Sequence, residues 1–199
     1  MTDRAQTFTL ESVTAAVLLV GTVIFVTQVG GVTALTASTS SQQVTEAQYG
    51  VAVGVLDAAA ADGAVRATLL SWDPDDSSFH GTGDYRYSVN GEMPTAFGTL
   101  LNESFAGSGY TYNVNVVHVD PTTNEQRRVP VIRQGTPTDD AVRAGRTVTL
   151  YDDDVLLDAS GAETETTLTE ASSFHVPDAV DGDGPIYNVV RVEVVVWPV

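Results

Sequence analysis

Lysine and cysteine are both absent from this 199-residue sequence. All nine basic residues are arginines, and they stand against 26 aspartates and glutamates, so the formal net charge is -17. Without cysteine the chain can form no disulfide and offers no thiolate to a metal or a substrate. Nucleic acid is also a poor partner, because phosphate contacts need a basic patch. The composition suits concentrated salt, since at about 1 M the Debye length is only ~3 Å and repulsion between like charges is screened.

The sequence also lacks the common signatures of catalysis and metal binding. Its three histidines, His80, His118 and His175, lie far apart and form no H-E-x-x-H spacing, and there is no G-x-S-x-G elbow or phosphate-binding glycine loop. Aspartates gather at 73–76, 152–154 and 178–183 and offer the oxygen ligands that Ca²⁺ prefers, but none of these groups completes an EF-hand. In so acidic a chain such groups are usually solvated loops. We therefore predict no enzyme activity, no cofactor and no metal site.

One long uncharged apolar segment is present near the N-terminus. Val13 to Val29 reads VTAAVLLVGTVIFVTQV, and the segment extends through Leu35, which is long enough for the ~20 residues that span a bilayer as a helix. This predicts a single-pass transmembrane helix with the C-terminal domain outside the cell. A secretory signal peptide is the alternative, although its apolar region is typically shorter and Ala34 to Ala37 fits a cleavage site poorly.

The remaining chain changes from helical to strand periodicity. A polar spacer from Thr36 leads into an expected helical stem, Glu46 to Ala61, and DPDD at 73–76 ends regular structure. A further helix is expected over Pro94 to Phe105. Alternating residues then predict four strands, at 110–118, 127–133, 147–151 and 188–199. The last of these should be well buried, since its alternate valines at 190, 192, 194 and 196 share one face, with Arg191 and Glu193 on the other. Pro130 has no amide donor and therefore indicates an edge or a bulge in the second of these strands.

The residues before the apolar segment carry a motif. RAQTFTLE, residues 4–11, runs directly into it. This resembles the class III signal of type IV pilins, and Gln134 to Asp154 is similar to a segment of haloarchaeal pilin-like proteins. The resemblance implies that a prepilin peptidase cuts between Gln6 and Thr7 and that the helix stays in the mature protein. It also implies that Glu11, then the fifth residue, pairs with the terminal amine of a neighbouring subunit.

This sequence departs from the pilin pattern in its leader, which is short and has one basic residue, Arg4, partly offset by Asp3. A simpler interpretation of the motif is that Thr9 caps the helix and Glu11 complements the helix dipole. A carboxylate in a membrane helix, however, is costly and calls for a partner.

Together these observations predict an α+β fold: a long N-terminal hydrophobic helix, transmembrane and pilin-like, followed by a β-rich, mainly antiparallel ectodomain. The expected parts are a leader (1–6), the hydrophobic helix (7–35), a spacer and stem (36–72) and the extracellular domain (73–199). Asn102 begins an N-glycosylation sequon in that domain. The predicted function is a structural or adhesive pilin-like subunit of the cell surface, whose partners are the membrane, other such subunits and the peptidase. The alternative is a membrane-tethered binding or hydrolytic module that does not polymerise.

Overall fold

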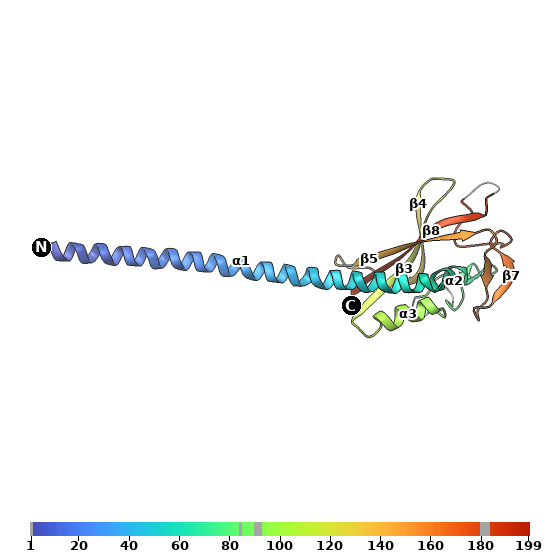
Figure 1. The fold of residues 1–199 in the computed structure, drawn as a ribbon, viewed down its shortest axis with the longest axis horizontal. Helices are drawn as coiled ribbons and strands as arrows, with labels where there is room; N and C mark the ends of the chain where they lie inside the picture. Colours follow the sequence, from blue (N-terminus) through green and yellow to red (C-terminus); the bar gives the residue numbers. More distant parts are fainter. Residues whose placement is uncertain (1, 84, 90–92, 180–183) are drawn as a thin grey trace. The chain divides into compact units, whose positions relative to one another are not determined.

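The computed structural model describes residues 2–83, 85–89, 93–179 and 184–199, and within its first helix the side chains of residues 2–14, 25 and 27–41 are not described. The chain divides into two compact units, Met1–Val44 and Thr45–Val199. The helices, in chain order, are α1 (Thr2–Ala61), α2 (Ala64–Leu70) and α3 (Ala96–Phe105) (Figure 1). The strands are β1 (Trp72–Asp73), β2 (Ser78–Phe79), β3 (Tyr110–Val119), β4 (Gln126–Arg133), β5 (Val142–Tyr151), β6 (Val155–Leu157), β7 (Glu163–Thr167) and β8 (Ile186–Pro198).

A four-stranded antiparallel sheet forms the centre of the second unit. Its strand order is β4-β3-β8-β5, so the C-terminal strand β8 lies between β3 and β5. Alternate valines of β8 are at most 1% exposed and face the core: Val190, Val192, Val194 and Val196. They pair with inward residues of β3 such as Val114 and Val116. The prediction of a well-buried C-terminal strand is therefore confirmed.

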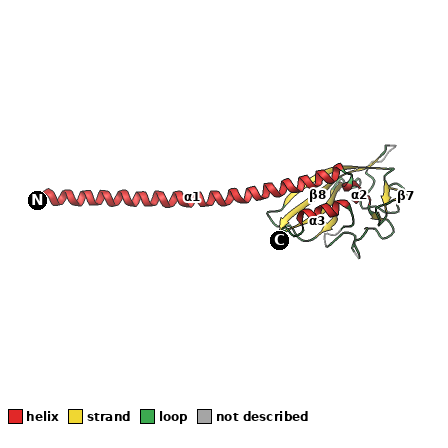
Figure 2. Cartoon of the chain, turned by 60° about the horizontal axis from the view of Figure 1, so that its bottom comes forward, coloured by secondary structure: helices red, strands yellow, loops and turns green. Residues whose placement is uncertain are grey.

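Helices cover the inward face of this sheet (Figure 2). In α1, Ala52, Leu56 and Ala59 recur at helical spacing and are at most 2% exposed, which makes one apolar stripe. Phe97, Leu101 and Phe105 of α3 join the same core. The described members of the core cluster all lie between Ala52 and Val196, so the second unit has a hydrophobic core of its own.

The turn between α1 and α2 depends on Gly63. Its φ of 73° lies in the left-handed region, where glycine has no steric penalty, and its N–H donates to the carbonyl of Ala60. The chain can therefore leave α1 and begin α2 at Ala64 within two residues. α1 thus ends at Ala61, the last residue of the expected helical stem.

Strand β4 contains the irregularity that Pro130 predicts. Val114 of β3 pairs with Ile132 and Asn115 pairs with Pro130, so Val131 is an extra residue on β4. β4 is also the last strand at its side of the four-stranded sheet. Ser88 continues the hydrogen bonding there, because its N–H donates to the Val131 carbonyl and its carbonyl accepts from Arg133. The proline is tolerated because the bulge removes the need for its missing donor.

One part of the predicted fold class is wrong. The α+β class with antiparallel sheets agrees with the structure. The transmembrane helix does not: within the part of the chain that the structure describes, no helix combines the length and the apolar character needed to cross a membrane.

Candidate functional site

The residues singled out from the sequence lie in two helices. Gln6, Thr7 and Glu11 fall within the backbone of α1, but their side chains lie outside the described residues. Asn102 lies on α3 with an exposed side chain, as the sequon requires of an acceptor. Two residues on, the Ser104 hydroxyl donates to the Leu100 carbonyl at 2.7 Å.

The first unit carries a run of exposed apolar side chains on α1. Seven large apolar residues have between 51% and 68% of their surface exposed: Val17, Leu18, Leu19, Val20, Val23, Ile24 and Val26. Scattered exposed apolar residues are normal in proteins, but a contiguous run of this kind marks an interaction surface. From here on, the name apolar segment is kept for these seven residues.

A second candidate surface is the outward face of the four-stranded sheet, which carries four of the nine arginines. We define the arginine face as this group with the polar residues between them: Arg128, Arg133, Arg143, Arg191, Asn113, Asn115 and Glu193. Strand register places them together. Arg133, Asn113, Val195 and Arg143 form one row across the sheet. A parallel row contains Arg128, Val117, Arg191 and Thr147.

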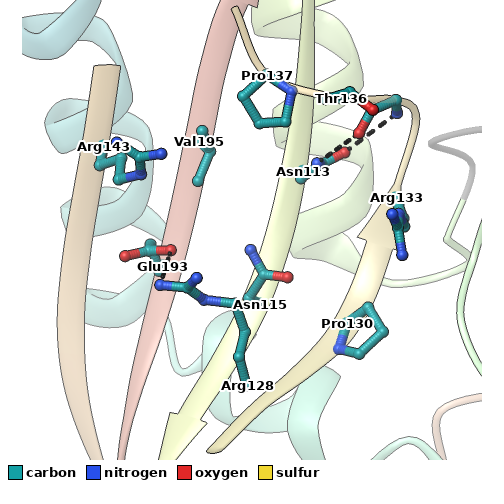
Figure 3. A pocket seen from close by; sticks show the side chains of 11 residues that line it. Asn113, Asn115, Arg128, Pro130, Arg133, Thr136, Pro137, Arg143, Glu193 and Val195 are labelled. Carbon is teal, nitrogen blue, oxygen red and sulfur yellow. Dashed lines mark hydrogen bonds and ion pairs between the residues drawn. The ribbon is translucent and has the colours of Figure 1, made fainter. Parts of the chain in front are cut away.

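A hollow of about 370 Å³ lies on the arginine face (Figure 3). The guanidinium of Arg128 reaches Glu193, with 3.1 Å between Nη2 and Oε1. Glu193 is only 8% exposed, and its Oε1 is buried without a hydrogen bond of good geometry. The buried carboxylate therefore holds one guanidinium by charge and leaves hydrogen-bonding capacity unused.

Gly145 leaves room for the side chain of Arg191 on this face. A Cβ on Gly145 would lie 2.2 Å from Nε of Arg191, so the arginine side chain passes over this glycine. Glycine at this strand position allows the close approach. Asn113 is also held in place, because its Oδ1 accepts from Gln134 N–H at 2.8 Å and its Nδ2 donates to the Gly135 carbonyl at 3.0 Å.

The charge of the arginine face contrasts with that of the whole chain. Four arginines against one glutamate give it a net charge of +3, within a chain of net charge -17. Other arginines are neutralised by ion pairs: Arg66 with Asp154, Arg146 with Asp57, and Arg127 with Asp120 and Glu125. Among the described residues Arg133, Arg143 and Arg191 have no such partner. The face can therefore attract anions, and carboxylates in particular match the guanidinium fork.

Sequence reasoning did not find the arginine face. Arg191 and Glu193 were placed opposite the inward valines of the last strand, which is confirmed. Arg128, Arg133 and Arg143 come from other strands, and only the register joins them. The available indication was limited to β5 and β8, in which Arg143 and Arg191 each lie between two buried residues.

A larger hollow, of about 710 Å³, is lined by aromatic residues and contains His175. The His175 ring packs against Trp72, Phe79 and Phe174, with ring centroids 4.1 to 5.3 Å apart. Because a carbonyl only accepts, Nε2 must carry the proton that it donates to the Leu69 carbonyl at 2.9 Å. The Nδ1 atom is buried without a partner. Burial lowers the pKa of His175 from 6.5 to about 4, although the hydrogen bond to Leu69 opposes this shift.

We expect this histidine to make stability fall in acid. Between pH 6.5 and about 4 the unfolded chain binds a proton that the folded chain does not, so acidification favours unfolding by up to about 3 kcal/mol. Urea unfolding of wild type and His175→Gln across this range measures the effect, because glutamine keeps a donor for Leu69 but cannot titrate. The profile of the variant should be flatter by that amount. Parallel profiles would contradict the assignment, since all other groups titrate alike in both proteins.

The other two histidines have structural positions. His118 is 6% exposed on β3, as the strand pattern predicts, and His80 Nε2 lies 3.0 Å from the Leu157 carbonyl. Aspartates from two of the acidic clusters, at 73–76 and 152–154, make hydrogen bonds or ion pairs within the fold. Asp73 Oδ1 accepts from the amides of Asp75 and Asp76, and Asp154 pairs with Arg66. Among the described residues, no group of three or more acidic or histidine side chains could hold a metal ion.

Comparison with known proteins gives a family but no function. No curated protein and no solved structure matches the chain. A family model described as a family of unknown function, DUF7288, matches residues 4–196 and so covers both the apolar segment and the arginine face. The chain therefore belongs to the DUF7288 family.

Proposed function

We propose that this chain is a pilin-like structural subunit of a cell-surface assembly, in which α1 packs against α1 of other copies. The observation that carries the proposal is the exposure of the apolar segment. Covering a Val, Leu or Ile side chain stabilises an assembly by about 1.5–3 kcal/mol before entropic costs. Seven such residues on one helix make helix-to-helix packing favourable in water.

The rest of α1 supports this role. Leu56 and its neighbours fix the C-terminal part of the helix in the core of the second unit. The helix is continuous from Thr2 to Ala61, without a proline. A contact made by the apolar segment would therefore connect whole subunits. The RAQTFTLE motif, residues 4–11, adds the resemblance to type IV pilins, and the family match includes most of this helix.

Cysteine crosslinking can test the assembly, because the chain has no cysteine of its own. Full-length Leu18→Cys should form disulfide-linked dimers in cells under mild oxidation. In that background Val23→Arg should reduce dimers at least about tenfold, since an unpaired charge in an apolar contact costs more than about 1.4 kcal/mol.

The matched control is Val119→Arg. Val119, at the end of β3, is 48% exposed and Val23 is 54% exposed, so both variants add the same charge at similar exposure. The control should leave the dimer yield unchanged. Equal yields in all three proteins, or no dimer in any, would reject assembly through α1 and favour the alternative of a surface module that acts without polymerising.

A further inference from the structure

The arginine face has the properties of a site for carboxylates. Arg133 and Arg143 lie in one row on the two outer strands, about 14 Å apart by the usual strand spacing. Between them is the hollow that Asn115 and Glu193 help to line. Glu193 already shows that a carboxylate fits beside Arg128. Arg143 is exposed and has no acidic partner among the described residues, so it can accept one from outside.

We propose that the arginine face docks acidic side chains of a second copy of this chain. The argument is charge complementarity: the face is positive, and the rest of the chain carries a large negative excess. Exposed carboxylates stand on several turns and on β7, including Asp75, Asp76, Asp153, Glu163 and Glu165. A neighbouring copy brings these to the face with the geometry that guanidinium groups favour.

The contact joins two different surfaces, so it is heterologous. Such contacts repeat from copy to copy and build rings or open filaments. The inference thus deepens the proposed assembly and rests on it, because copies held together by α1 present their second units to one another at high effective concentration. In strong brine, pairs that are partly buried in the hollow are screened less than fully exposed pairs.

The absence of lysine provides a specific test. Carbodiimide joins amines to carboxylates, so Arg143→Lys introduces the one side-chain amine in the chain and keeps the positive charge. Full-length protein is produced separately in ¹⁵N-labelled and unlabelled form, and equal amounts are mixed and allowed to assemble together. The mixture is then crosslinked, digested and analysed by mass spectrometry. We expect mixed-isotope peptides that join position 143 to aspartates or glutamates of the other copy.

The control is Arg127→Lys. Arg127 is exposed on β4 but pairs with Asp120 and Glu125 of its own chain, at 3.7 and 3.3 Å. Its links should stay within one copy, so mixed-isotope links should be at least about tenfold more frequent from position 143. In addition, Arg143→Glu combined with Arg191→Glu should reduce co-purification of two differently tagged copies, whereas Arg127→Glu should not.

Two outcomes would overturn the inference: links from position 143 confined to one copy, or links to carboxylates that do not belong to this chain. Leu18→Cys dimers measured on the same preparations separate this failure from failure of the proposed function. If these dimers form while position 143 makes no mixed-isotope links, the assembly stands and the arginine face is not its second contact.

Discussion

Replacing Leu56 by aspartate is expected to unfold the second unit. Leu56 lies in α1, is 2% exposed and belongs to the core cluster. Truncation of such a leucine alone costs about 2–5 kcal/mol, and a buried carboxylate without a partner adds several more. The sum is comparable to the entire stability of a typical domain, about 5–15 kcal/mol. Circular dichroism and thermal unfolding of the full-length chain should show that the β signal is lost or melts far below that of wild type.

The matched control is Val51→Asp on the same helix. Val51 is 48% exposed, so its substitution introduces the same carboxylate into the same helix without burying the charge. We expect a change within about 1 kcal/mol. A folded and stable Leu56→Asp protein would show that the C-terminal part of α1 is dispensable to the core, and would remove the connection through which α1 contacts could join whole subunits.

Much of the β structure could be predicted because burial imposes a period of two. In the last strand the core-facing valines at 190, 192, 194 and 196 alternate with residues on the opposite face, two of which are charged, and similar alternation located β3 and β4 within a residue or two. The β5 strand was expected only from Thr147, but it begins at Val142. The missed residues include Gly145 and two arginines, which have little strand propensity by themselves. They lie in a strand because β8 pairs with them along their whole length.

α1 includes the stretch that was expected to be a polar spacer. TASTSSQQ, from Thr36, is small and polar, which indicated an exit from the apolar region before the helical stem. The backbone is helical through this stretch. Polar residues weaken a helix by tenths of a kcal/mol each, whereas proline costs about 3 kcal/mol and none is present before Pro74.

The arginine face could not be derived from the sequence, for a different reason. Its members come from four strands, and the order β4-β3-β8-β5 places the last strand of the chain between earlier ones. A shift of one residue in any register would move an arginine to the core side. Local alternation shows which residues point outward, but only the long-range pairing shows that they meet.

Two glycine-to-alanine substitutions should change stability in opposite directions, and Gly98 should have the larger effect. A Cβ at Gly98, in the first turn of α3, would lie 2.4 Å from the Met93 carbonyl oxygen and 2.9 Å from Met93 Cβ. Backbone has to move to relieve this contact, and Met93 is only 4% exposed. Overpacking of this kind costs about 1–3 kcal/mol, and it also disturbs the cap in which the Thr95 hydroxyl accepts from Gly98 N–H.

Gly54→Ala is the matched control, since Gly54 is an exposed residue of α1 and a Cβ added there would have nothing within 4 Å. There alanine should stabilise the helix by about 0.5–1 kcal/mol, because glycine loses more backbone entropy on folding. Each kcal/mol shifts the thermal midpoint by roughly 2–4 °C in a chain of this size. Calorimetry should therefore show Gly98→Ala melting several degrees below wild type and Gly54→Ala slightly above it. If both substitutions raised the midpoint, the close packing of Met93 on α3 would be refuted, because helix propensity alone would then decide both results.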